Sequence, residues 1–258
     1  MVSTTSLRTT CAALAFGLAC AGLPALAGET EAKDIITAMS EYLGSQTTLS
    51  FDYESTVEVI TTDAQKLSVT SSGSLAMERP DKLHVSRSGG FAQVAGVFDG
   101  KAFTVENLTT KNYAVFDAPG SVEQLVEKLR TDLGLVLPAA DLLDADVASQ
   151  IFAQAKDIKD LGSGVIAGTE CDHIAFRADD LDWQLWVAQG VDPYPCRYQV
   201  TSRKVDGMPD YTLTVSNWGK GSAKADFAFK PSEGATKVEI KELAGVDEIA
   251  GIYVVKGN

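Results

Sequence analysis

Metal ligands and reactive thiols are scarce in this chain of 258 residues, which has two histidines and four cysteines. A transition-metal site needs several converging nitrogen or sulfur ligands. His84 and His173 therefore predict no such site, and we expect no metal and no cofactor. Asp179, Asp180 and Asp182 stand close together, but they lack the glycine and the terminal glutamate of an EF-hand calcium loop. We interpret them as a polar hairpin turn, with a weak calcium site as the alternative.

Signature motifs of the common enzyme classes are missing as well. The sequence has no G-x-S-x-G, Walker or Rossmann pattern in a strand–turn–helix context. Aspartates and glutamates are scattered along the chain, and no spacing picks out two of them as a glycosidase pair. We therefore predict no catalytic residues and a protein that is not an enzyme.

Positive charge is in short supply. The chain has 22 Lys and Arg against 35 Asp and Glu, which gives a formal net charge of −13 at pH 7. This excess opposes long-range attraction to nucleic acid and to anionic membrane surfaces. We expect a soluble exported protein with no nucleic-acid partner.

The one long hydrophobic run lies at the N-terminus. An alanine-rich apolar segment spans Cys11–Leu26 behind a single charge, Arg8, and Ala25–Ala27 matches the small-x-small rule for secretory cleavage. The run is too short for a membrane-spanning helix of about 20 residues. Residues 1–27 are therefore predicted to be a cleaved signal peptide. A lipid-modified Cys20 and an uncleaved anchor are the alternatives.

Loss of the signal peptide leaves Cys171 and Cys196. An even pair of cysteines in an oxidising compartment predicts a disulfide. Cys171 and His173 would share one face of a strand, which leaves a thiol enzyme as an alternative, but an oxidised cysteine is no nucleophile. We expect Cys171 opposite residue 189 or 190 and Cys196 at the start of the next strand. The loop Gln189–Pro195 would then swing across the strand end to bring the Cα atoms within about 7 Å.

Helical periodicity occurs at the N-terminus and in the middle of the chain. It predicts a helix over 30–43 that ends at Gly44, and a helix over 121–133 that begins with a Ser121/Gln124 capping box and ends at Gly134. A short turn at 139–143 and a third helix capped by Asp144 follow.

The rest of the chain has the two-residue period of strands. In the first two, residues 49–59 and 67–77, the odd-numbered side chains are apolar. Shorter strands are expected over 81–88, 91–100, 101–107, 112–116, 158–168, 171–178, 181–188, 196–203 and 210–218, before a short closing strand. A sheet of about 11 strands cannot stay flat. We predict an α+β, mainly β fold: a strongly curved antiparallel sheet forming an incomplete barrel, with helices on its concave face. Residues 28–244 would form this domain, and 245–258 a C-terminal tail.

Apolar side chains on the concave face are candidates for ligand binding. Trp183 and Trp186 point to opposite faces, and Trp183 either packs under a helix or lines a cavity. The predicted lining consists of Phe51, Tyr53, Leu75, Leu83, Phe103, Trp183 and Leu185. A hydrophobic guest would require a cavity of about 300 Å³ or more.

Several short motifs occur in a recognisable order: Arg79-Pro80-x-Lys82, Asp99-Gly100-Lys101, PAADLL at 138–143, CDHxAFR at 171–177, WQLW at 183–186 and PxPCRY at 193–198. This set resembles the predicted periplasmic proteins of domain of unknown function 2092, which are similar to the lipoprotein-carrier (LolA/LolB-like) superfamily. The resemblance implies an incomplete barrel plugged by helices, which in the carriers holds acyl chains.

We therefore predict a monomeric periplasmic protein that binds or carries a hydrophobic ligand, a lipid or acylated molecule, between sheet and helices. The alternative is a structural or regulatory envelope protein with a filled core, no ligand and an envelope protein as its partner.

Overall fold

The computed structural model describes residues 28–133, 140–219 and 226–246. The predicted signal peptide, Cys20 and Gly134 lie outside these residues. Within them, no helix is both long enough and apolar enough to cross a bilayer.

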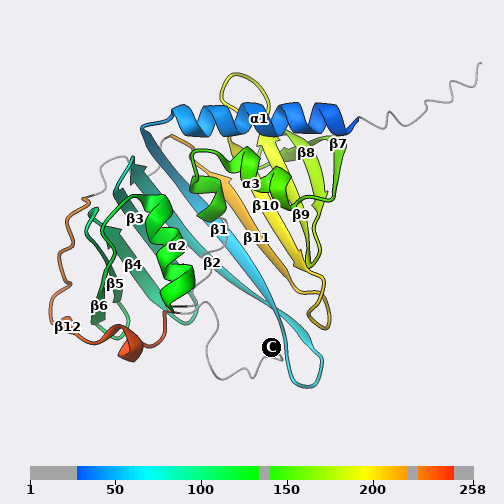
Figure 1. Cartoon of the computed structure of the whole chain (residues 1–258). Coiled ribbons are helices and arrows are strands. Elements are labelled where there is room, and N and C mark those ends of the chain that lie inside the picture. Colours follow the sequence, from blue (N-terminus) through cyan, green and yellow to red (C-terminus); the bar gives the residue numbers. More distant parts are fainter. Residues whose placement is uncertain (1–27, 134–139, 220–225, 247–258) are drawn as a thin grey trace, which may run out of the picture.

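A single curved sheet of 12 strands forms the body of the protein (Figure 1). The strand order is β12-β6-β5-β4-β3-β2-β1-β11-β10-β9-β8-β7. The strands are β1 (Thr48–Ile60), β2 (Lys66–Glu78), β3 (Lys82–Gly89), β4 (Gln93–Phe98), β5 (Ala102–Asn107), β6 (Asn112–Asp117), β7 (Asp157–Ile166), β8 (Thr169–Arg177), β9 (Leu181–Ala188), β10 (Pro195–Ser202), β11 (Asp210–Ser216) and β12 (Thr236–Lys237). Neighbours are antiparallel, except that β12 pairs parallel with β6. The predicted curved, open sheet is confirmed.

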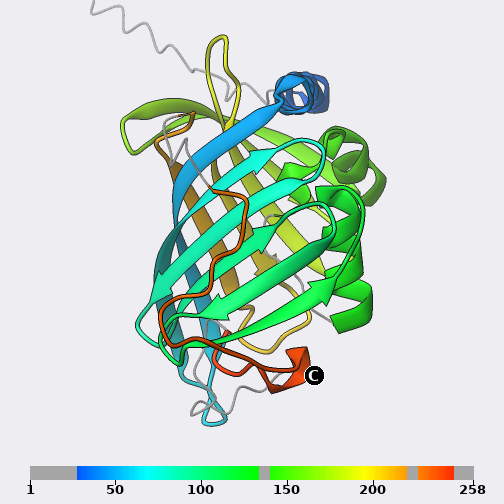
Figure 2. The same ribbon diagram turned by 90° about the vertical axis from the view of Figure 1, so that its left-hand side faces the viewer.

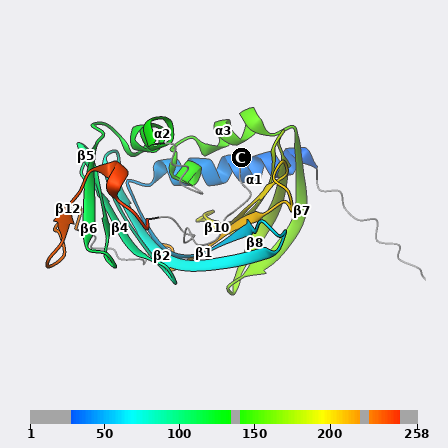
Figure 3. The same cartoon turned by 90° about the horizontal axis from the view of Figure 1, so that it is seen from below.

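Helices cover the open side of the sheet, as Figure 3 shows from below. They are α1 (Glu29–Ser45), α2 (Val122–Leu133) and α3 (Val147–Gln154), with the short 3₁₀ helices η1 (Ala140–Leu143) and η2 (Ile240–Glu242). The buried residues of α1 and α2 join one core with the concave side chains of the sheet. The three-helix, one-sheet plan is as predicted.

Strand register confirms which side chains face the helices. Phe51 lies opposite Leu75 in the β1–β2 pair, and Leu49 lies opposite Met77. All four are buried in the main core. A shift of one residue would turn this set outward, so the odd-numbered apolar pattern determines the concave face.

Helix ends were predicted with mixed success. The capping box is confirmed: the Ser121 N–H donates to Gln124 Oε1 (2.9 Å) and the Gln124 N–H donates to Ser121 Oγ (3.3 Å). Asp144 as the cap of α3 is wrong, because Asp146 is the N-cap and accepts the Ser149 N–H. Asp144 instead accepts a hydrogen bond from the Asp146 N–H (2.7 Å).

Gly44 does not end α1, which continues to Ser45. A Cβ atom at this position would lie 2.6 Å from the carbonyl oxygen of Ala145. The glycine is therefore explained by the close approach of the segment before α3, a contact between residues about a hundred positions apart.

The cysteines are joined on the convex side of the sheet. Cys171 and Cys196 form a disulfide with a Cα–Cα distance of 6.9 Å. Cys171 pairs with Ala188, one residue from the predicted position. The predicted route of the loop is also wrong. β10 pairs regularly on the far side of β9, and a register shift between Pro195 and Arg197 displaces Cys196 toward β8.

Candidate ligand-binding face

The seven predicted lining residues all lie on the concave face. Phe51, Leu75, Leu83, Phe103, Trp183 and Leu185 are buried in the main core, and Tyr53 is half-buried against it. They come from β1, β2, β3, β5 and β9, strands that span most of the sheet. The curvature thus gathers one apolar surface from residues more than a hundred positions apart. Their role in ligand binding stays a prediction.

Coverage of this face decreases along the strands. On β1, Leu49 and Phe51 are buried at the end near α1, whereas Tyr53 and Val57 are half-buried further along. Figure 1 shows the reason, because the three α-helices lie over the upper and outer parts of the sheet and not over its lower centre. The concave surface thus has a sealed part and a less covered part.

An aromatic stack closes the sealed part at the end of α1. The Trp218 ring lies between Phe51 (centroids 5.4 Å apart) and Tyr194 (4.9 Å), and both pairs are stacked. The Trp218 indole N–H also donates to the Tyr42 hydroxyl on α1 (3.0 Å). The sequence analysis missed Trp218, and a tryptophan just after an alternating strand was the available signal.

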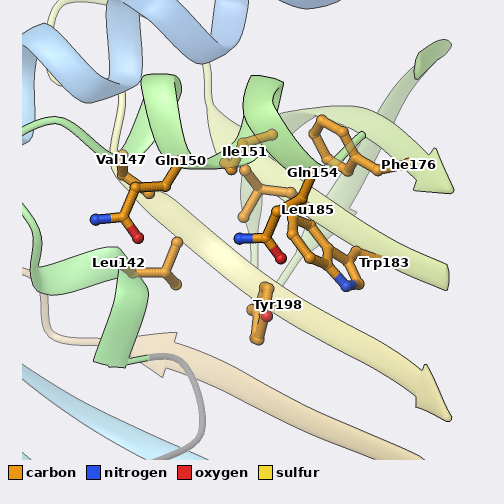
Figure 4. A pocket seen from close by; sticks show the side chains of 9 residues that line it. All are labelled: Leu142, Val147, Gln150, Ile151, Gln154, Phe176, Trp183, Leu185 and Tyr198. Atoms are coloured by element: carbon orange, nitrogen blue, oxygen red, sulfur yellow. The ribbon is translucent and has the colours of Figure 1, made fainter. Parts of the chain in front are cut away.

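A small pocket lies between α3 and strands β8–β10 (Figure 4). Its lining is Leu142, Val147, Gln150, Ile151, Gln154, Phe176, Trp183, Leu185 and Tyr198. The cavity volume is about 20 Å³, which accommodates about one water molecule. The expected cavity of about 300 Å³ is therefore not present here. Of the seven predicted residues, Trp183 and Leu185 line this pocket.

The pocket has a polar mouth and one unsatisfied donor. Gln150 and Gln154, one helical turn apart on α3, are exposed and lie over the opening. The Trp183 indole N–H is buried and has no hydrogen-bond partner among the described residues. A buried unpaired donor costs about 1–3 kcal/mol, and a guest oxygen would remove that cost.

Tyr53 shapes the centre of the concave face. Its ring crosses Gly73 of β2, and its hydroxyl donates to the Ser86 carbonyl of β3 (2.9 Å). A Cβ atom at Gly73 would lie 2.5 Å from that hydroxyl oxygen. The missing side chain on β2 therefore allows a tyrosine on β1 to reach the next strand but one.

Arg79 holds two of the covering helices to the sheet. Its guanidinium donates to the Glu123 carboxylate of α2 and to the Leu143 carbonyl of η1, each at 2.7 Å. The side chain is 13% exposed, so both bonds are largely shielded from water. The sequence analysis placed Arg79 in a turn and assigned it no such contact.

The three clustered aspartates are paired with cations. Asp179 pairs with Lys156, Asp180 with Lys204, and Asp182 with Arg177. The hydrogen bond from Arg177, followed by charge attraction, lowers the pKa of Asp182. This network is that of a solvated hairpin turn.

His173 lies on the convex face, away from this surface. Its ring stacks on Trp186 (centroids 4.1 Å apart), and its Nε2 hydrogen-bonds Gln184 Oε1 (3.0 Å). Burial lowers the pKa of His173, against opposing effects from Gln184 and Asp160. With Cys171 already in a disulfide, these two residues do not form a nucleophile and its base.

Comparison with known proteins identifies the family. No curated protein matches the chain by sequence. Among solved structures, an uncharacterised conserved protein from Thermus thermophilus is similar over 81% of this chain and 99% of its own, with 12% identity and a TM-score of 0.45. The Mycobacterium tuberculosis lipoprotein LppX aligns over 78% of this chain and 100% of its own (14% identity, TM-score 0.40). A LolA superfamily protein from Nitrosomonas europaea aligns over 77% and 97% (12% identity, TM-score 0.34). The family model for predicted periplasmic proteins of domain of unknown function 2092 matches residues 32–241, and the chain belongs to that family.

Proposed function

We propose that this protein binds a hydrophobic guest, a lipid or acylated molecule, between its covering helices and the concave face of the sheet. The observation that carries the proposal is the pocket under α3, where an apolar lining surrounds the unpartnered indole N–H of Trp183. Mostly apolar surfaces with a few placed polar groups are typical of small-molecule sites. The buried N–H suits an ester or carboxyl oxygen at one end of the guest.

Entry of the guest requires movement, because about 20 Å³ of cavity holds no acyl chain. The element to move is α3, an eight-residue helix with Val147, Ala148 and Ile151 buried. It is attached to α1 by a hydrogen bond from the Ala148 N–H to Ser40 Oγ (3.1 Å). Displacing so short a helix exposes few apolar side chains, so the face can open at low cost.

The same proposal covers compartment and chemistry. The protein acts in the periplasm after loss of residues 1–27, binds as a monomer, and performs no covalent reaction on its guest.

Fluorescence titration tests guest binding directly. The chain has three tryptophans, of which Trp183 faces the pocket and Trp186 the convex side. Palmitate, phosphatidylethanolamine or a palmitoylated peptide should change the emission of the wild type and of Trp186→Phe. The change should be lost in Trp183→Phe, which keeps an aromatic ring and removes the N–H. A guest at 100 times its Kd should also add about 2.7 kcal/mol to the free energy of unfolding. No response to any of these lipids in either signal would refute the proposal.

A second candidate is an envelope interaction protein with a filled core. It is favoured by the small volume of the pocket, which needs no guest to be stable. Lipid-free protein recovered from the native envelope by native mass spectrometry, together with a silent titration, would favour this candidate.

A further inference from the structure

The C-terminal segment first follows the outside of the sheet. Residues 226–239 run along the convex face of β3–β6, where Figure 2 shows them crossing the strands. The buried Glu106 carboxylate accepts the Ser232 N–H (3.2 Å), and the Lys111 ammonium donates to the Glu233 carbonyl (2.9 Å). Pairing of β12 with β6 then brings the chain to the sheet edge.

The segment then turns to the inside. Asn107 lies on β5 in the same alternation as Phe103, on the concave side, and is 1% exposed. Its side-chain amide donates to the carbonyls of Ala244 (3.0 Å) and Gly245 (2.9 Å). Arg87, which lies opposite Gly73 on the concave side of β3, donates to the Val246 carbonyl. Side chains of the concave face thus hold three successive carbonyls of the chain.

Twelve residues follow Val246, with the sequence DEIAGIYVVKGN. Two acids come first, directly after the residue whose carbonyl Arg87 binds. An apolar run from Ile249 to Val255 comes next, interrupted only by Gly251. Twelve extended residues reach about 40 Å, close to the length of the 13-residue β1, about 44 Å. The segment is therefore long enough to cross the concave face from its point of attachment.

The less covered part of the concave face is an apolar surface of matching kind. Its half-buried valines are Val57, Val69, Val85, Val105 and Val200. They surround the lower centre of the sheet, which the three α-helices leave uncovered.

We propose that residues 247–258 dock on this valine-rich surface as an internal occupant, which a hydrophobic guest must displace. The docking stands on the contacts of Asn107 and Arg87, and its regulatory role rests on the proposed guest binding. The tail shields the apolar surface when no guest is present. Guest affinity is thereby reduced in proportion to the fraction of molecules in which the tail is bound.

Photo-crosslinking tests docking without any guest. The full chain with Tyr253→p-benzoylphenylalanine should crosslink within one molecule to β1, β2, β10 or β11, as mapped by peptide mass spectrometry. The same probe at Val191, which is 92% exposed, is the control and should give no such crosslinks. Crosslinks between two molecules, or none to the concave strands, would overturn the proposal.

Truncation tests displacement. A chain ending at Val246 keeps the Asn107 and Arg87 anchors, and its melting temperature verifies folding. If the tail is bound in about 90% of molecules, truncation should tighten palmitate binding about tenfold. Full-length Ile252→Asp/Val254→Asp should match the truncated chain, and Lys256→Ala should match the wild type.

Equal palmitate affinity of the full and truncated chains would overturn the regulatory role. Failure of both chains to bind any lipid, with the intramolecular crosslinks present, would refute the proposed function and leave the docking intact.

Discussion

Gly73→Ala should destabilise the fold although it adds only one methyl group. The new Cβ would lie 2.0 Å from the Ser86 carbonyl oxygen and 2.6 Å from Tyr53 Cζ. The carbonyl belongs to the β2–β3 ladder and cannot retreat without breaking strand pairing, so the tyrosine ring and the backbone must both shift. Overpacking of this kind costs about 1–3 kcal/mol. Loss of the bond from the Tyr53 hydroxyl to Ser86 adds about 0.5–1.5 kcal/mol.

Urea denaturation gives the measurement, with Gly90→Ala as the matched control. A Cβ at Gly90 meets no atom within 4 Å, so that variant should be neutral or slightly stabilised by the reduced entropy of its unfolded chain. We expect Gly73→Ala to lie about 2–4 kcal/mol below Gly90→Ala in free energy of unfolding. The reasoning fails if the two variants unfold within about 0.5 kcal/mol of each other, the usual range for neutral substitutions.

Three further predictions concern the helices, the histidines and the disulfide. Arg79→Ala should reduce the free energy of unfolding by about 2–4 kcal/mol, because it removes two charged hydrogen bonds to the covering helices; unchanged protection of α2 amides in hydrogen exchange would contradict this. Burial lowers the pKa values of both His84 and His173, so below about pH 6.5 the unfolded chain binds protons that the folded chain does not. The urea midpoint should therefore fall from pH 7.5 to pH 5.5, less steeply in His84→Gln/His173→Gln, and a midpoint that rises would contradict the sign. Replacing Cys171 and Cys196 by serine should cost about 3 kcal/mol, and two alkylatable thiols in unreduced exported protein would contradict the disulfide.

Local rules predicted what local chemistry decides. The alternation of Leu49, Phe51 and Tyr53 placed the concave face correctly, since side chains alternate across a strand whatever lies beyond it. The Ser121/Gln124 capping box formed as predicted because its partners are three residues apart and need no other element. The sequence thus determined the strands, the covered face of the sheet and the two long helices.

The features that were predicted wrongly depend on distant neighbours. Gly44 looked like a helix terminus, but the carbonyl of Ala145 explains it. Asp144 looked like a cap, but the chain turns into α3 two residues later. Neither contact has a sequence signature, because each joins elements brought together by the curvature of the sheet.

The candidate site divides along the same line. The sequence by itself determined which side chains line the concave face, since register follows from the two-residue period. Only the tertiary structure decided how much room they leave, because a cavity volume is a small difference between the space enclosed and the side chains that fill it. The tertiary structure likewise decided that the C-terminal segment passes from the convex to the concave side, through Asn107 and Arg87. Those contacts span more than a hundred residues, and a local pattern carries no information about them.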